Sequence, residues 1–318
     1  MTRALSSRGP GGRWSLMLLV AIGLLLYLSL SRTVMSAVGS PDRPMMRMVT
    51  DGVGRQVEVP DSPRRIITLT PSLAEMTYSI GAGDAIVGVT DNTDYPDAAR
   101  TKPRVGGIVD PSIERIVSLH PDLVLATLES NHPTTIDAIQ RLGIPVFAIR
   151  PQGLEGILQG IEQVGSALNR VAQAHAEVGR LRARQEAVGR RVAGLPKPRA
   201  FVLIWPDPVM TVGHHAFITE AIEAAGAVCV TRDLPQEWPR LSLEEVVRLA
   251  PDTLVLIANG HPTLQTETMK SRPGWDRVPA VVAGRFVEVD ARLQHSSPAV
   301  FDAVEQLAAL FHPEVFQK

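Results

Sequence analysis

Two segments of this chain, residues 112–125 and 242–255, follow the same pattern. Each begins with a serine suited to capping a helix, carries a glutamate two positions later, and spaces apolar residues at helical intervals. Each then breaks at Pro-Asp and continues into a short apolar strand. A shorter echo relates residues 75–81 to residues 220–226, both of which run from a glutamate to a glycine. A chain that repeats a helix-to-strand unit across its midpoint predicts two similar α/β lobes. Facing lobes form a cleft, where ligands bind.

Composition excludes some classes of protein. The chain has 318 residues, of which 45% are hydrophobic, so it can bury large cores. Its net charge is −1 and no long run of one sign occurs, so nucleic acid is not an expected partner. The single cysteine, Cys229, lies in an apolar run and is predicted to be a buried core residue. One cysteine cannot form an internal disulfide.

The N-terminus predicts export. Three arginines precede an uncharged apolar stretch that ends near Ser31, a pattern typical of a signal peptide or a membrane anchor. The arginines keep residues 1–13 in the cytoplasm, so the chain after residue 32 is expected to be periplasmic or otherwise extracytoplasmic. Small residues at Ala37 and Gly39 could support cleavage, and both alternatives stay open. If residues 14–31 are retained, they anchor the protein to the inner membrane. No cysteine directly follows that stretch, so a lipoprotein anchor is not expected.

The remaining chain divides into a tether, two lobes and a bridge. Residues 32–48 show no period and are predicted to be a tether, followed by an N-terminal α/β lobe over residues 49–153. The region 154–195 contains no proline and keeps helical apolar spacing up to residue 192, so we expect one long helix. A pair of antiparallel helices is the alternative, but no cluster of turn residues supports it. Residues 196–318 form the second lobe. The predicted fold is thus two Rossmann-like lobes with parallel sheets, joined by a single backbone helix.

No catalytic motif emerges from the sequence. A glycine-rich dinucleotide loop after a strand, a phosphate-binding loop and a nucleophile elbow are all absent, so we expect neither an enzyme, nor a cofactor, nor a metal centre. Among the histidines, His215 follows a glycine in an expected loop, where it could touch a ligand or be solvated. His295 lies before the last helix, in the kind of strand-to-helix loop where α/β proteins bind ligands.

Aromatic residues make up only 4% of the chain, so their positions are informative. Tyr95 lies in the loop after the second strand of the first lobe. Trp205 ends the first strand of the second lobe, and Trp238 lies in a later loop. An exposed loop tryptophan needs an apolar partner. That partner is either a ligand or, for Trp238, the core of its own lobe.

Glu114 and Glu244 occupy the same position in the two repeats. An acidic residue in the first turn stabilises a helix by about 0.3–1 kcal/mol, which is a sufficient structural explanation. Glu245 additionally completes a predicted capping box with Ser242. A pair of carboxylates related by the repeat would also fit a partner with two matching arginine patches.

Several motifs together resemble the helical-backbone periplasmic binding proteins that feed iron-siderophore, haem and vitamin B12 ABC importers. They are GRQVEVP at 54–60, RIITLTPS at 65–72, GAGDAIVG at 81–88, DYP at 94–96, ERIVSLHPD at 114–122, LGIP at 142–145, WP at 238–239 and GRFVEVD at 284–290. The spacing around DYP and WP is most similar to that of the cobalamin-binding members. The resemblance implies that Tyr95 and Trp238 line a corrin pocket. It also implies that Glu114 and Glu244 dock onto permease arginines.

The chain differs from the cobalamin-binding members at two places, so the identity of the ligand is not decided by the resemblance. Ile108 stands where the cobalamin-binding members carry a tryptophan, and residues 292–295 replace a second pocket aromatic. A haem or a ferric siderophore, bound through arginine or histidine, is the alternative ligand. The expected function is capture of a corrinoid or related metal chelate by a monomer that delivers it to an ABC permease and ATPase complex. A membrane-tethered sensor of the same fold is a further alternative.

Overall fold

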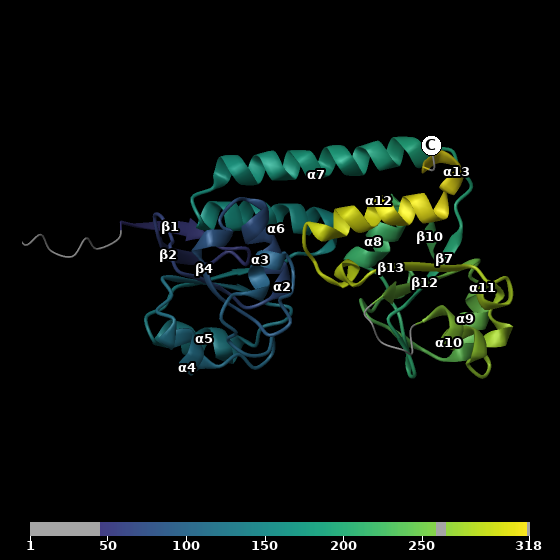
Figure 1. Ribbon diagram of the computed structural model, residues 1–318, viewed down its shortest axis with the longest axis horizontal. Helices are drawn as coiled ribbons and strands as arrows, with labels where there is room; N and C mark the ends of the chain where they lie inside the picture. Colours follow the sequence, from purple (N-terminus) through teal and green to yellow (C-terminus); the bar gives the residue numbers. More distant parts are fainter. Residues whose placement is uncertain (1–44, 259–264, 317–318) are drawn as a thin grey trace, which may run out of the picture. The chain divides into compact units, whose positions relative to one another are not determined.

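Two four-stranded parallel sheets follow one another in the computed structural model, which describes residues 45–258 and 265–316 (Figure 1). The chain divides into two units, Met1–Met45 and Met46–Lys318, and both sheets belong to the second. The first sheet has the order β4-β3-β5-β6 and the second β10-β7-β12-β13. In both, the strand that comes first in the chain lies between the second and the third. This identical order confirms the two α/β lobes predicted from the repeat.

The elements alternate as the sequence analysis predicts. The strands of the parallel sheets are β3 (Ile66–Thr68), β4 (Ile86–Val89), β5 (Leu123–Thr127), β6 (Val146–Ile149), β7 (Arg199–Leu203), β10 (Val228–Cys229), β12 (Thr253–Ala258) and β13 (Phe286–Asp290). The antiparallel strands are β1 (Met46–Thr50) and β2 (Gln56–Pro60), which pair, and β8 (Trp205–Pro206), β9 (Val209–Met210) and β11 (Arg240–Leu241), which form a small sheet. The helices between them are α2 (Pro71–Ser79), α3 (Asp97–Arg100), α4 (Ile113–Ser118), α5 (Pro133–Arg141), α8 (Phe217–Ala224), α9 (Leu243–Leu249), α10 (Thr266–Ser271), α11 (Pro279–Val282), α12 (Ala299–Phe311) and α13 (Pro313–Phe316).

Local chemistry sets the ends of the repeated helices. At the start of α4 the Ser112 hydroxyl accepts a hydrogen bond from the Arg115 N–H at 3.3 Å. At the start of α9 Ser242 and Glu245 form the predicted capping box, in which each side chain accepts from the other residue's backbone N–H. These bonds satisfy donors that no preceding turn can reach. The serines of the repeat are therefore helix caps.

The prediction of one bridging helix is wrong, because the segment forms two helices, α6 (Gly153–Ala167) and α7 (Val171–Val192). Asn169 adopts a left-handed backbone with φ of +54°. Its N–H bonds to the Ser166 carbonyl at 3.2 Å, and the Arg170 N–H bonds to the Gly165 carbonyl at 2.7 Å. This pattern is a Schellman ending, which needs only one left-handed residue, and asparagine adopts that conformation more readily than most. The turn therefore requires no cluster of glycine and proline.

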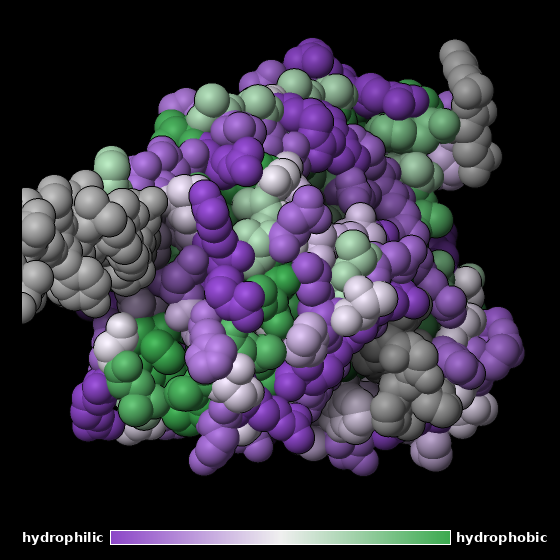
Figure 2. Space-filling model, turned by 60° about the vertical axis from the view of Figure 1, so that its left-hand side comes forward, coloured by the Kyte–Doolittle hydropathy of each residue, from purple (hydrophilic) through white to green (hydrophobic). Residues whose placement is uncertain are grey.

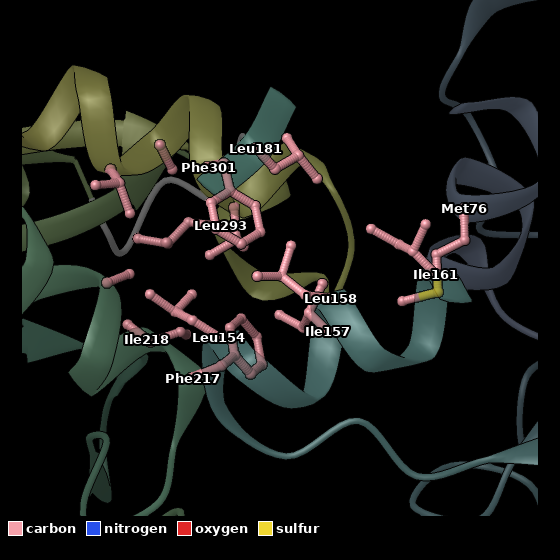
Figure 3. Close-up of a cluster of buried hydrophobic side chains, with 14 of the residues drawn as sticks. Met76, Leu154, Ile157, Leu158, Ile161, Leu181, Phe217, Ile218, Leu293 and Phe301 are labelled. Carbon is pink, nitrogen blue, oxygen red and sulfur yellow. The ribbon is translucent and has the colours of Figure 1, made fainter. Parts of the chain in front are cut away.

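Helix α6 joins the cores of the two lobes (Figure 3). Near its start, Leu154 and Leu158 lie among residues of the second lobe, including Phe217 of α8. Towards its end, Ile161 meets Met76 of α2 in the first lobe. One continuous buried cluster thus runs from lobe to lobe through α6 and along α7. Opening of the cleft has to preserve this shared core, which favours small movements.

The face of the protein shown in Figure 2 is mostly polar, and its hydrophobic side chains gather in separate groups. Cys229 is buried, as predicted, and Trp275 is a core residue. Across residues 45–258 and 265–316, no helix is both long and apolar enough to cross a membrane. The predicted signal or anchor, residues 14–31, lies outside the described residues.

Candidate ligand-binding cleft

A buried carboxylate connects the two lobes. Glu75 of α2 is only 4% exposed. Its Oε1 accepts a hydrogen bond from Nδ1 of His295 at 2.8 Å, and its Oε2 accepts one from the Ser297 hydroxyl at 2.6 Å. Both partners belong to the segment between β13 and α12, in the second lobe. A buried carboxylate is costly unless it is paired, so these two bonds hold the lobes together at this point.

Two cavities adjoin this connection. One, of about 350 Å³, is lined by Thr70, Pro71, Ser72, Asn92, Ile108 and Ser130 of the first lobe and by Gln294, His295 and Ser296 of the second. The other, of about 400 Å³, is lined by residues that include Glu75, Tyr78, Tyr95 and Arg180. A larger cavity of about 600 Å³ is lined only by residues 196–314, so it is not shared between the lobes. The two smaller cavities mark the cleft that the repeat predicts.

Tyr95 meets the second lobe directly. It lies just before α3 with 40% of its surface exposed, and the guanidinium carbon of Arg292 is 4.6 Å from the centre of its ring. Arg292 is held in turn by Asp290, whose pKa is lowered because the bonds and charge of Arg292 outweigh the opposing effect of burial. A cation over an aromatic face is worth about 0.5–1 kcal/mol at an exposed site. Tyr95 therefore lies at the boundary between the lobes.

Two candidate residues, Trp238 and His215, lie on neighbouring loops of the second lobe. Trp238 is 40% exposed, and its ring meets Phe217 edge-on with the centroids 6.4 Å apart. His215 has a left-handed backbone with φ of +65°, and its ring lies 3.8 Å from that of His214. The two loops are joined, because the Gly213 N–H bonds to the Glu237 carbonyl at 2.9 Å.

Trp205 lies on β8, 37% exposed, and its indole N–H donates to the Asp207 carbonyl at 3.0 Å. The three aromatic candidates are thus partly exposed on their lobes, and within residues 45–258 and 265–316 no ring contact joins Tyr95 and Trp238.

Two carboxylates of opposite lobes, Glu129 and Glu237, both have raised pKa values. Glu129, after β5, has a pKa raised to about 7, chiefly by burial among the surrounding protein and then by the charge of Glu237, while Arg150 opposes the rise. The pKa of Glu237, next to Trp238, is also raised by burial, and His215 opposes that rise. Both side chains keep contact with solvent. The cleft therefore resists further negative charge at this point.

The candidate docking carboxylates are exposed on their lobes. Glu114 lies in the first turn of α4 and Glu244 in the first turn of α9. The Ser112 hydroxyl donates a hydrogen bond to the Glu114 carboxylate at 3.0 Å. The pKa of Glu114 is lowered by hydrogen bonds from its own backbone N–H and from that hydroxyl. Both glutamates thus stabilise their helices, and both are free to meet a partner.

Sequence reasoning missed Glu75, Ser297, Glu129 and Glu237. Only Glu75 left a signal, because it starts the echo of residues 75–81 in residues 220–226. Its counterpart Glu220 has a similar role, since its Oε2 accepts a hydrogen bond from the Leu154 N–H at 2.6 Å at the start of α6. Each repeated glutamate therefore bonds a segment outside its own lobe: Glu75 reaches the second lobe, and Glu220 reaches the start of α6. In the part of the chain that the structure describes, no three His, Cys, Asp or Glu residues are grouped to hold a metal ion.

Known proteins share this architecture. An uncharacterized ABC transporter substrate-binding lipoprotein of Bacillus subtilis, YvrC, is 29% identical over 85% of this chain and 87% of its own. The vitamin B12-binding protein of Yersinia pestis is 27% identical over 76% of this chain and 84% of its own. In structure, the chain is similar to the periplasmic heme-binding protein RhuT of Roseiflexus sp. RS-1, with a TM-score of 0.73 and 24% identity over 79% of this chain and 99% of that one. The similarity to RhuT shows a shared fold only.

The match to a family covers both lobes. Residues 66–293 fit the periplasmic binding protein family, from the first strand of the first sheet to the segment before His295. This range includes α6, α7 and the strands of both sheets. The resemblance inferred from the motifs is confirmed, and the chain belongs to the periplasmic binding protein family.

Proposed function

We propose that this chain is the substrate-binding protein of an ABC importer and that it captures a corrinoid such as cobalamin between its lobes. The observation that carries the proposal is the set of side chains at the lobe boundary. Tyr95 of the first lobe lies under Arg292 of the second. Trp238 follows Glu237, whose charge acts on Glu129 across the cleft. Half-exposed aromatic rings near such a boundary suit a large, flat ligand, since each ring adds apolar area with few rotatable bonds.

The charge of the cleft supports a corrinoid over an anionic chelate. The periphery of a corrinoid carries neutral amides, whose N–H groups can donate to Glu129 and Glu237. Haem carries two carboxylates instead. The pKa of Glu129 is already raised, chiefly by burial and then by the charge of Glu237, and haem carboxylates nearby would add to that second effect. The vitamin B12-binding relative in Yersinia pestis agrees with this preference.

A specific observation favours the alternative, haem. Arg292 and His295 both lie at the boundary of the lobes, where they could meet a haem carboxylate or its iron. The fold is also that of the heme-binding protein RhuT. The two candidates differ in net charge, so direct binding separates them. In either case the proposed function is capture and delivery without chemistry, as the substrate-binding relatives suggest.

A titration of tryptophan fluorescence tests the proposal. The protein without residues 1–44 is mixed with cyanocobalamin, haem and a ferric hydroxamate siderophore in separate experiments. We expect cyanocobalamin to quench the fluorescence at the lowest concentration, because it matches both the aromatic rings and the carboxylates. Tighter binding of haem would select the alternative, and binding of none of the three would contradict both.

A further inference from the structure

One ring nitrogen of His295, Nδ1, is already hydrogen-bonded to Glu75. A carboxylate can only accept, so the bond between Glu75 and Nδ1 places a proton on Nδ1. With Nδ1 protonated, the neutral form of the ring has its lone pair on Nε2. Within the described residues, Nε2 has no recorded hydrogen-bond partner. The side chain is 27% exposed and lines the cavity of about 350 Å³ between the lobes.

This arrangement is the one that proteins use to orient a metal-binding histidine. Such a histidine almost always donates its other ring N–H to a carboxylate or carbonyl, which fixes the tautomer and makes the free nitrogen more basic. Here the carboxylate is itself fixed, because Glu75 is buried and also accepts a bond from the Ser297 hydroxyl. The ring is therefore held from one side and presents its other side to the cleft. A residue whose only task is to tie two lobes together needs no exposed ring nitrogen.

We propose that His295 coordinates the cobalt of the bound corrinoid through Nε2 and that Glu75 is its positioning residue. This inference rests on the proposed function, capture of a corrinoid in this cleft. The step is an exchange of ligands: the bond between cobalt(III) and an axial water breaks, a bond between cobalt and Nε2 forms, and the water leaves. No electron moves. Corrinoids with an exchangeable axial water are thereby favoured over those whose axial positions are held by strong ligands.

The visible absorption spectrum of the corrinoid tests this step. Aquocobalamin has an exchangeable water, whereas cyanocobalamin holds cyanide in that position. We expect the wild-type protein to bind both, to shift the corrin absorption bands of aquocobalamin only, and to bind aquocobalamin more tightly by roughly tenfold or more, as expected for a ligand to a metal.

Three variants locate the effect. His295→Ala should abolish the absorption shift and lower the affinity for aquocobalamin to that for cyanocobalamin. Glu75→Gln should weaken aquocobalamin binding by roughly 10–100-fold, as loss of a supporting carboxylate does. Glu186→Gln is the matched control: it replaces an exposed carboxylate on α7, leaves both bonds to Glu75 in place, and should keep the shift. Circular dichroism melting checks that each variant is folded.

The outcomes separate the two proposals. Binding of both corrinoids by the wild type without any absorption shift would overturn coordination and leave the proposed function standing. A shift that survives in folded His295→Ala would likewise overturn it. Failure of the wild type to bind either corrinoid would overturn the proposed function, and the coordination with it.

Discussion

At the residue scale, ionisation of Glu129 makes the stability of the protein depend on pH. Its folded-state pKa of about 7 lies above the ordinary value of 4.5, chiefly because the surrounding protein partly desolvates the carboxyl group of this otherwise exposed residue, and then because Glu237 repels its charge. Between pH 4.5 and 7 the folded protein therefore binds more protons than the unfolded chain. The free energy of unfolding falls as pH rises through this window and is level above it. The raised pKa of Glu237 acts in the same direction.

Replacing Glu129 tests whether its ionisation lowers the stability of the protein as pH rises. Glu129→Gln cannot ionise, so the variant should gain thermal stability relative to the wild type as pH rises from 4.5 to 7, with no further gain up to pH 8. Thermal melting followed by circular dichroism at each pH measures the difference. Glu186→Gln, on the exposed face of α7, is the control and should follow the wild type. A constant difference between Glu129→Gln and the wild type would show that Glu129 ionises normally.

Trp238 separates a binding role from a structural one. Its ring is 40% exposed and meets Phe217 only by its edge. A stacked aromatic contact contributes on the order of 1–2 kcal/mol to binding, so Trp238→Ala should weaken cyanocobalamin binding about tenfold and leave the melting temperature of the free protein nearly unchanged. Trp238→Phe should retain most of the affinity. Lost stability with unchanged affinity would instead make Trp238 a core residue.

At the scale of elements, the contact between α6 and α7 depends on one glycine. A Cβ atom on Gly165 would lie 2.3 Å from the Cβ of Ala174, so the two helices can cross closely only because this position lacks a side chain. This crossing follows directly from the Schellman turn at Asn169. It sets the position of α6, whose apolar residues join the two lobes.

Paired alanine substitutions test this crossing. Gly165→Ala should destabilise the protein by about 1–3 kcal/mol, the usual cost of overpacking. Gly179→Ala, in α7, meets nothing within 4 Å and should stabilise the protein by about 0.5–1 kcal/mol, because alanine favours a helix over glycine. Unfolding in urea measures both. Equal effects of the two substitutions would show that α6 and α7 are not in close contact.

At the scale of the whole molecule, the repeat places one exposed glutamate on each lobe. Glu114 and Glu244 occupy equivalent helix starts, as Glu75 and Glu220 occupy equivalent positions on α2 and α8. Glu75 and Glu220 each bond a segment outside their own lobe. Glu114 and Glu244 are open to a partner, and we propose that they dock onto arginines of the permease.

The double variant Glu114→Gln, Glu244→Gln tests the docking role. Loss of two surface charges should slow association with the permease and reduce its dependence on salt, while ligand affinity stays unchanged. Stimulation of ATP hydrolysis by the permease and ATPase complex in lipid vesicles measures the coupling. Glu186→Gln with Glu267→Gln removes the same charge from exposed sites on α7 and α10 and should couple normally. Normal coupling by the first variant would rule out docking through these residues.

The sequence by itself determined the lobes and their elements. Helix caps, apolar periodicity and Pro-Asp breaks act over a few residues, so the repeat predicted both sheets and the positions of Glu114 and Glu244. Tertiary structure decided the features that depend on contacts between residues far apart in the sequence. The turn at Asn169 forms because α6 and α7 can bury apolar faces together, a gain that local propensity does not contain. The bond between Glu75 and His295 joins residues 220 positions apart, and Glu237, whose charge adds to the raised pKa of Glu129, belongs to the other lobe. Such encounters depend on how whole elements pack, which no local pattern specifies.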